Sequence, residues 1–277
     1  LRRRALWANW RGIADLRPGG AAGDALPPIP GREFAAFATV PGASQPHRVL
    51  VQVPDGFDPA KPCIVVAPAS GSRGVYGAIA VAAPWALPRG CAVVYTDKGA
   101  GTDYLDLAND MGVGVSGMAA SGHEPVAFAP ETTASTGVAF KHAHSQDNPE
   151  ADWGWHVRQA AEFGLHVLTT QFATHGPFTA TNTRVIAVGI SNGGGAVLRA
   201  AEQDDALLDA VVAGEPNIFA DAPGSRPLYD YATLAARLMP CALLDMDDFP
   251  QPPMSDAMRA AGAQRCASLK ARGELRA

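Results

Sequence analysis

The sequence predicts an α/β protein whose sheet is mainly parallel and carries helices on both faces. Two observations lead to this fold class. Continuous apolar runs alternate with helical patterns along most of the chain, and one of these runs ends in a serine that is flanked by glycines. Strands that alternate with helices are typical of parallel sheets, because each helix carries the chain back to the start of the next strand.

Composition narrows the class of protein further. The chain has 277 residues, of which 47% are apolar and 18% charged, so it has the material for a sizeable core. A net charge of -5 offers no basic surface for nucleic acid, and no apolar run is long enough to predict a membrane span. The four cysteines form no CxxC pair. Cys63 and Cys91 lie in apolar runs, where buried free thiols are common, although an even count also permits disulfides.

The first part of the chain reads as an irregular lead-in, residues 1–32, followed by a hairpin and two buried strands. Residues 33–40 and 47–54 are strand-like runs separated by a Pro- and Gly-containing turn. The runs at 61–70 and 90–99 are apolar without alternation, as expected for strands covered on both faces. A short helix between them should end before Pro88.

Residues 100–152 lack any sustained periodicity. A stretch of that length is either a functional loop or a small subdomain inserted in the core. An apolar helix face follows at 157–172, then a strand at 184–190, a helix at 193–203 and a strand at 208–217. We therefore expect a core at 33–219 that contains this insertion. Helical patterns at 226–243 and 255–272 make residues 220–277 the start of a cap over the sheet.

The serine lies in the pattern Gly189-Ile190-Ser191-Asn192-Gly193, which fits G-x-S-x-G. A strand leads in and a helix leads out, which is the setting of a nucleophile elbow in α/β-hydrolase-type enzymes. Side chains at 189 and 193 would collide across so sharp a turn. The Asn192 N–H should point toward an oxyanion beside Ser191. The alternatives are a tight turn without chemistry or a phosphate cradle; a Walker loop is excluded because no Lys-Ser/Thr pair follows the glycines.

An oxyanion hole needs a second donor, and the loop after the strand at 61–70 is where this architecture supplies it. Ser70 and Gly71 are the candidates, with an ordinary strand-to-helix turn as the alternative. A base is also required, and all seven histidines precede Ser191, whereas these hydrolases place the acid and the histidine after the serine. We expect a C-terminally truncated chain that lacks both groups, in agreement with its start at Leu1. The alternative is an upstream histidine in an unusual order.

A histidine-rich stretch in the insertion raises a second question. His142 and His144 with Asp147 have a spacing that a metal ion could use, but surface or loop-pinning roles and substrate contacts are the preferred interpretations. His156, at the start of a helix, is expected to be packed or capping. No metal and no cofactor is expected.

Several long segments resemble the D-(-)-3-hydroxybutyrate oligomer hydrolases. They are VVYTDKGAGT (93–102), residues 139–168, GISNGGGAVLRAAEQD (189–204) and VVAGEPN (211–217). The resemblance implies an ester hydrolase that cleaves soluble oligomers from polyhydroxybutyrate degradation into monomers, with Ser191 as nucleophile. Family members are usually described as secreted, with intracellular relatives, so the resemblance implies an extracellular protein.

Two other functions stay open. Tannases and feruloyl esterases are a more distant likeness and would make the protein an aromatic esterase. A non-catalytic α/β-hydrolase-like binding protein would explain the missing histidine without truncation. The only partner expected in the enzymatic interpretation is a small ester oligomer, without nucleic acid or membrane, and the isolated chain should be inactive for want of the acid and the histidine.

Overall fold

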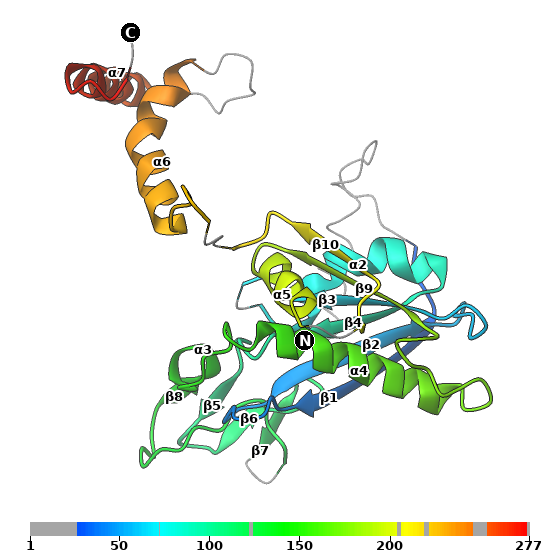
Figure 1. The fold of residues 1–277 in the computed structure, drawn as a ribbon. Coiled ribbons are helices and arrows are strands. Elements are labelled where there is room, and N and C mark those ends of the chain that lie inside the picture. The colour runs from blue at the N-terminus through cyan, green and yellow to red at the C-terminus, as the bar shows by residue number, and fades with distance from the viewer. Residues whose placement is uncertain are drawn as a thin grey trace. The chain divides into compact units, whose positions relative to one another are not determined.

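A computed structural model describes residues 27–71, 73–121, 124–203, 206–218, 222–245 and 254–275. The chain divides into two compact units, Leu1–Asn217 and Ile218–Ala277, which are taken separately below. The first unit is built on a six-stranded sheet (Figure 1). Its strands are β1 (Gly31–Ala38), β2 (His47–Pro54), β3 (Cys63–Pro68), β4 (Ala92–Thr96), β9 (Arg184–Ile190) and β10 (Ala210–Gly214).

The strand order is β1-β2-β4-β3-β9-β10, and the pairing confirms a mainly parallel sheet. Strands β4, β3, β9 and β10 run parallel to their neighbours, whereas β1 and β2 form an antiparallel hairpin that joins the sheet at β4. The carboxyl ends of the four parallel strands therefore meet at one edge. In open sheets of this kind that edge is where ligands bind.

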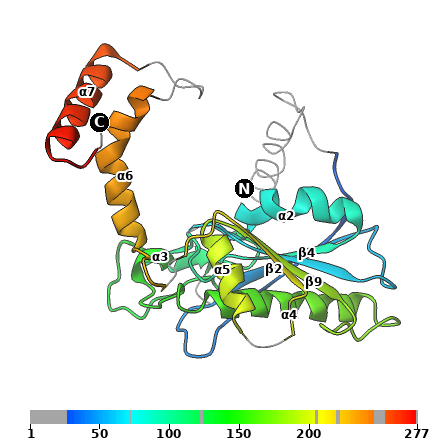
Figure 2. The ribbon, with the colours of Figure 1, turned by 45° about the horizontal axis from the view of Figure 1, so that its top comes forward.

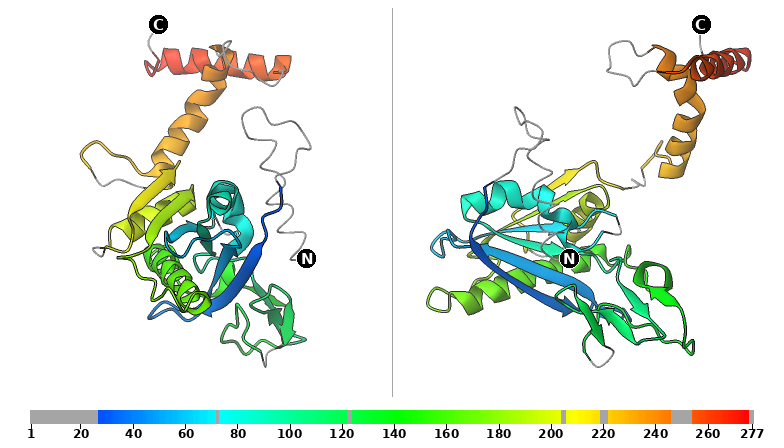
Figure 3. Two further views of the ribbon diagram at one scale, coloured as in Figure 1. Left: turned by 90° about the vertical axis from the view of Figure 1, so that its right-hand side faces the viewer. Right: turned by 180° about the vertical axis from the view of Figure 1, so that it is seen from behind.

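Helices cover both faces of the sheet, as the sequence predicts (Figures 2 and 3). Within β3, Ile64 and Val66 pack in the core under α4 (Trp153–Gln171) and α5 (Asn192–Ala201). Val65 and its neighbour Ala67 pack in the core under α2 (Ile79–Ala86). Because successive strand residues point to opposite faces, an apolar run without alternation supplies both cores at once.

The insertion is a small subdomain, not a structureless loop. It contains a second sheet in the order β7-β6-β5-β8. The elements are β5 (Tyr104–Asp106), β6 (Met111–Val113), β7 (Ala119–Ser121), β8 (Val138–Phe140) and the short helix α3 (Lys141–His144). Leu105, Phe128 and Ala139 form its own small core, which explains why so short a set of strands persists.

A short helix lies between β3 and β4, with a 3-10 turn at each end. It starts as the 3-10 turn η2 (Val75–Ala78), continues as α2, and runs on into a second 3-10 turn, η3 (Leu87–Arg89). The prediction of a short helix that ends before Pro88 is confirmed, because α2 ends at Ala86. Pro88 lies at the start of the following turn η3, where its missing N–H costs nothing, and Gly90, with a φ of 78°, ends that turn.

The second unit consists of α6 (Leu228–Ala242), the turn η4 (Leu243–Asp245) and α7 (Asp256–Ala271), so both expected helices are present. A disulfide between Cys241 and Cys266 joins the two helices. The cap over the sheet stays a prediction. Within the described ranges, no helix is long and apolar enough to cross a bilayer.

Of the two alternatives left open for Cys63 and Cys91, free thiols or a disulfide, the structure has the disulfide. Its Cα–Cα distance is 4.6 Å. The register of the sheet explains the pairing. Ile64 lies opposite Ala92 in the parallel pair β3–β4, so the residue before each of them is brought side by side. The two cysteines are far apart in the chain and meet only when these strands pair.

We predict that the disulfide of the second unit stabilises α6 and α7 specifically. Replacing both Cys241 and Cys266 by Ser should destabilise this pair of helices by about 3 kcal/mol, because the bridge closes a loop of some 25 residues. Amide hydrogen exchange should accelerate in α6 and α7 but not in the sheet.

The matched control replaces Cys63 and Cys91 by Ser, which should instead accelerate exchange in β3 and β4. Thiol titration of the denatured, unreduced wild-type protein should find no free cysteine. Four reactive thiols before reduction would contradict both bridges.

Candidate active site

Ser191 lies at a sharp strand-to-helix turn. Strand β9 ends at Ile190 and helix α5 begins at Asn192, so a single residue reverses the chain. Ser191 has φ 57° and ψ -122°, a region of backbone space that residues other than glycine rarely adopt. The strain is held by hydrogen bonds on both sides: the Ser191 N–H donates to Gly214, and its carbonyl accepts from Gly195 and Asn217. This is the elbow conformation that the sequence predicts.

The two elbow glycines are required by close backbone approaches. A Cβ at Gly189 would lie 2.1 Å from the carbonyl oxygen of Gly193, which confirms the predicted collision across the turn. A Cβ at Gly193 would instead meet the carbonyl oxygen of Pro68 at 2.7 Å. Gly193 therefore serves a different purpose from the one expected: it lets the start of α5 approach the end of β3.

The loop after β3 reaches the elbow. A Cβ on Gly71 would lie 3.6 Å from the Asn192 side-chain oxygen, so Gly71 borders the residue that follows Ser191. Gly71 itself has φ 56°. The Ser70 and Gly71 N–H groups donate no hydrogen bond within the described part of the chain. The structure thus brings Ser70, Gly71 and Asn192 together, as expected for an oxyanion site, and leaves these two backbone donors available.

The sequence analysis missed Lys98, a buried residue that follows β4. Its side chain has no exposed surface, and its Nζ donates to the carbonyl oxygens of Ala69 at 2.5 Å and Gly71 at 2.8 Å. The signal was available, because β3, β4 and β9 are parallel neighbours whose carboxyl ends share one edge. Lys98 follows strand β4 by two residues, which places it at the same edge of the sheet as Ser70 and Ser191.

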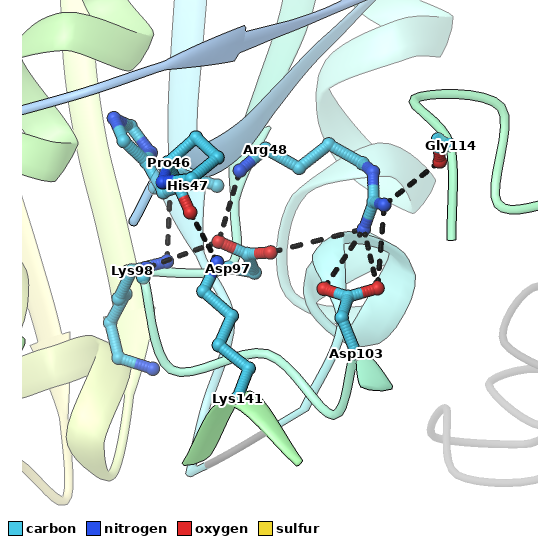
Figure 4. A network of polar contacts seen from close by, with 10 residues as sticks. Pro46, His47, Arg48, Asp97, Lys98, Asp103, Gly114 and Lys141 are labelled. Atoms are coloured by element: carbon cyan, nitrogen blue, oxygen red, sulfur yellow. Dashed lines mark hydrogen bonds and ion pairs between the residues drawn. The ribbon is translucent and has the colours of Figure 1, made fainter. Parts of the chain in front are cut away.

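A buried carboxylate, Asp97, lies beside Lys98 in a network of charged groups (Figure 4). It accepts the N–H groups of Arg48 and Gly99 and forms an ion pair with the Arg48 guanidinium. Burial by itself raises the pKa of Asp97, but Lys141, His47 and Arg48 together outweigh burial and hold this pKa below its ordinary value. Asp97 is therefore ionised at neutral pH and balances the surrounding positive charge.

No histidine activates Ser191 among the residues that the structure describes. The Ser191 hydroxyl makes no hydrogen bond there, and His47 is instead bonded to Thr96 and Gln159. His142 and His144 are exposed on α3. His123 lies outside the described residues. An upstream histidine in an unusual order thus finds no support in the geometry.

The histidine-rich stretch of the insertion has a structural use. Asp147 accepts the N–H and hydroxyl of Ser44 and the N–H of Gln45, so it pins the β1–β2 turn to the insertion. The Nδ1 of His144 is bonded to the backbone of Phe140. Across the described segments, no group of three or more His, Cys, Asp or Glu side chains could hold a metal ion. Substrate contact by His142 or His144 stays a prediction.

His156 is packed, one of the two roles expected for it. It is buried in the first turn of α4, with its ring 4.6 Å from that of His47 and its Nε2 against Gly99. Burial, with a smaller contribution from the neighbouring His47, lowers the pKa of His156 to about 3. The imidazole is therefore neutral at pH 7.

A pocket of about 400 Å³ opens where the segment after the Ser70 loop meets the insertion. It is lined by Arg73 to Gly77 on one side and by residues of the insertion, including Tyr104 and Val115, on the other. Arg48 and Asp103 contribute the buried charges of its wall. A site of this volume suits a small ligand.

Comparison with known sequences gives a consistent result. A family model described as 3HB-oligomer hydrolase matches residues 1–276. D-(-)-3-hydroxybutyrate oligomer hydrolases are similar to the chain: the one from Burkholderia cenocepacia is 40% identical over 326 residues, covering 99% of this chain and 47% of the relative. The one from Cupriavidus metallidurans is 39% identical over 322 residues, covering 98% and 44%. The chain spans about half the length of the curated relatives it matches.

Among solved structures, feruloyl esterase B from Aspergillus oryzae is similar with a TM-score of 0.39 and 15% identity, covering 72% of this chain and 31% of that one. Vibralactone cyclase has a TM-score of 0.37 and 17% identity, covering 95% and 61%.

We predict that the stability of the protein depends on the absence of a side chain at Gly189. Gly189→Ala should destabilise the protein by roughly 3 kcal/mol or more, because its Cβ would overlap a backbone oxygen that cannot move without opening the turn. The control is Gly56→Ala, since a Cβ there has nothing within 4 Å. That variant should change stability by at most about 1 kcal/mol. Equal denaturant midpoints for the two variants would contradict the close approach.

We predict that burial of His156 makes the folded protein less stable in acid. Its pKa is about 3 in the folded state and near 6.5 when unfolded, so the unfolded state binds more protons between these values. The free energy of unfolding should therefore fall as the pH drops from 6.5 toward 3. In His156→Asn, the loss between pH 7 and pH 4 should be smaller by about 3 kcal/mol. His166→Asn, on the exposed side of the same helix, is the control, and parallel curves for wild type and His156→Asn would refute the prediction.

Proposed function

The chain belongs to the 3HB-oligomer hydrolase family, and from this premise we propose that it supplies the nucleophile and oxyanion site of a serine esterase. The proposed reaction is hydrolysis of soluble 3-hydroxybutyrate oligomers to monomers, as in polyhydroxybutyrate degradation. The observation that carries the proposal is the conformation of Ser191: its strained φ of 57° is maintained at the tip of β9, where a hydroxyl can face substrate.

The chemistry follows from the groups around the elbow. The Ser191 oxygen attacks the ester carbonyl carbon, a C–O bond forms, and the carbonyl electrons move to its oxygen. The Asn192 N–H and a donor from Ser70 or Gly71 receive this oxyanion, and the first turn of α5 adds positive potential. The serine proton passes to the base assigned below and from it to the leaving oxygen, so that the tetrahedral intermediate collapses with loss of the alcohol. Water then releases the acyl group in a second round, and its remaining proton returns to Ser191.

A serine needs a base, and none of the described histidines reaches Ser191. We assign the base and its acidic partner to residues outside those described. Without these two groups Ser191 should show essentially no turnover, because loss of a triad member typically costs roughly 10⁴–10⁶-fold.

The pocket beside the insertion supports a small, polar-ended substrate. Its wall carries Arg48 and the exposed Arg73, and a free carboxylate ends each hydroxybutyrate oligomer. An aromatic esterase of the feruloyl or tannase type is the second candidate, and Tyr76 and Tyr104 in the same wall are the feature in its favour.

An extracytoplasmic location is part of the proposal. All four cysteines are paired in disulfides, and such bridges form and persist mainly in oxidising compartments.

The function is tested with the complete product of the encoding gene beside the 277-residue chain. Hydroxybutyrate dimer and trimer should be cleaved faster than methyl ferulate or methyl gallate, and Ser191→Ala should abolish the activity. A clear preference for the phenolic esters would transfer the assignment to the second candidate.

The 277-residue chain is assayed on a short-chain nitrophenyl ester together with its Ser191→Ala, His142→Ala and His144→Ala variants. Turnover at ordinary enzyme rates that is lost in either histidine variant would show that the insertion supplies the base.

A further inference from the structure

Lys98 is a cation that is fully buried beside the loop after β3, although removing an ammonium group from water costs free energy. Moving an ammonium out of water disfavours its charged form, and burial lowers the pKa of Lys98 to about 8, while Asp97 and Glu150 act to raise it. The group is still largely protonated at neutral pH. A protonated Lys has three N–H donors, and two of them are directed at one loop.

The two acceptors bracket the two candidate oxyanion donors. The Ala69 carbonyl belongs to the same peptide unit as the Ser70 N–H, and the Gly71 carbonyl follows directly after the Gly71 N–H. A side chain that holds both carbonyls therefore fixes the direction of the peptide groups between them. A charge-assisted hydrogen bond to a carbonyl also polarises its peptide and strengthens the N–H at the other end.

Lys98 is itself held firmly in place. Its backbone has φ 58°, and its N–H donates to the Thr96 hydroxyl. The Nζ lies 5.3 Å from the centre of the Trp153 ring. In Figure 4 its side chain points away from the Asp97 carboxylate, and its Nζ donates to the Ala69 and Gly71 carbonyls of the loop after β3.

We propose that Lys98 is a positioning residue of the oxyanion site: its ammonium fixes the Ala69 and Gly71 carbonyls so that the Ser70 and Gly71 N–H groups face the oxyanion formed at Ser191. The inference rests on the proposed function, because it assumes that Ser191 is the nucleophile. It extends that function to a residue that touches neither substrate nor serine.

The test uses covalent labelling of the 277-residue chain by an alkyl fluorophosphonate, which needs no turnover. The Ser191 oxygen forms a bond to phosphorus, fluoride leaves with the electrons of the P–F bond, and the hydroxyl proton passes to buffer. The phosphoryl oxygen takes the place of the oxyanion. Saturation kinetics separate reagent binding from the rate of the covalent step, and mass spectrometry identifies the labelled residue.

Three variants are compared with the wild type. Lys98→Met keeps the stem and removes the donors, Lys98→Arg keeps a charged donor, and Ser191→Ala sets the background. Lys141→Met is the matched control, because Lys141 is also a buried ammonium bonded to a backbone carbonyl, that of Pro46, away from the Ser70 loop. Melting temperatures are recorded for all of them.

Slow, Ser191-dependent labelling is expected in the wild type, since an oxyanion site retains some rate enhancement without a base. In Lys98→Met the covalent step should slow about tenfold or more, with reagent binding little changed and partial recovery in Lys98→Arg. Lys141→Met should stay within about threefold of the wild type. These expectations scale from the 10²–10³-fold cost of losing an oxyanion donor outright.

Each other outcome overturns a specific statement. An unchanged covalent step in Lys98→Met, with Ser191 still labelled, would refute the role of Lys98 and leave the proposed function intact. Equal losses in Lys98→Met and Lys141→Met would reduce Lys98 to a structural residue. No labelling of Ser191 in the 277-residue chain and in the complete gene product alike would overturn the proposed nucleophile and this inference with it. Where only the complete gene product is labelled, the same variants are compared in it.

Discussion

The charges at the carboxyl edge of the sheet depend on one interaction, that of the buried Asp97 carboxylate with the positive side chains around it. Four residues that carry or can carry positive charge lie around it: Arg48, Lys98, Lys141 and His47. Burying the Arg48, Lys98 and Lys141 side chains as cations in a low dielectric without an anion would cost several kcal/mol each. Asp97 lies directly after β4. Its single carboxylate therefore balances positive charges from strand β2, from helix α3 and from the turn that carries Lys98.

The elbow depends on a different constraint, which is steric. Three backbone segments meet around α5, and glycine is needed where each approaches: the end of β9 at Gly189, the end of β3 at Gly193 and the segment after β10 at Gly194. Electrostatics and sterics are coupled through the loop after β3. The Ala69 carbonyl that accepts from Lys98 lies 3.4 Å from where a Cβ on Gly193 would be. The peptide groups of the loop after β3 thus contact both the charged network, through Lys98, and the elbow, through Gly193.

Much of this arrangement was accessible from the chain alone. The strands at 47–54 and 184–190 match their predicted ranges, and the elbow glycines were identified from a five-residue pattern whose geometry is local. The candidate donors Ser70 and Gly71 were placed at the carboxyl edge of the sheet, because a loop after a parallel strand lies there; their role in binding an oxyanion stays a prediction. The cysteine pairs could not be assigned in this way, because Cys63 and Cys91 meet only through the register of two strands joined by a helix. The order within the insertion was hidden for a similar reason: its strands are three residues long, too short for periodicity to show.

By itself, the sequence determined the class of fold, the position of the serine and the family, because each of these depends on local patterns that survive without knowledge of distant contacts. Only the tertiary structure decided which buried groups act together. Lys98 and Asp97 are adjacent in the chain but have different partners. Lys98 donates hydrogen bonds to the loop of Ser70 and Gly71, whereas the Asp97 carboxylate balances the charges of Arg48 and Lys141. The direction of a side chain after a strand depends on the backbone turn and on the partners available. Those partners come from segments that are far apart until the sheet assembles.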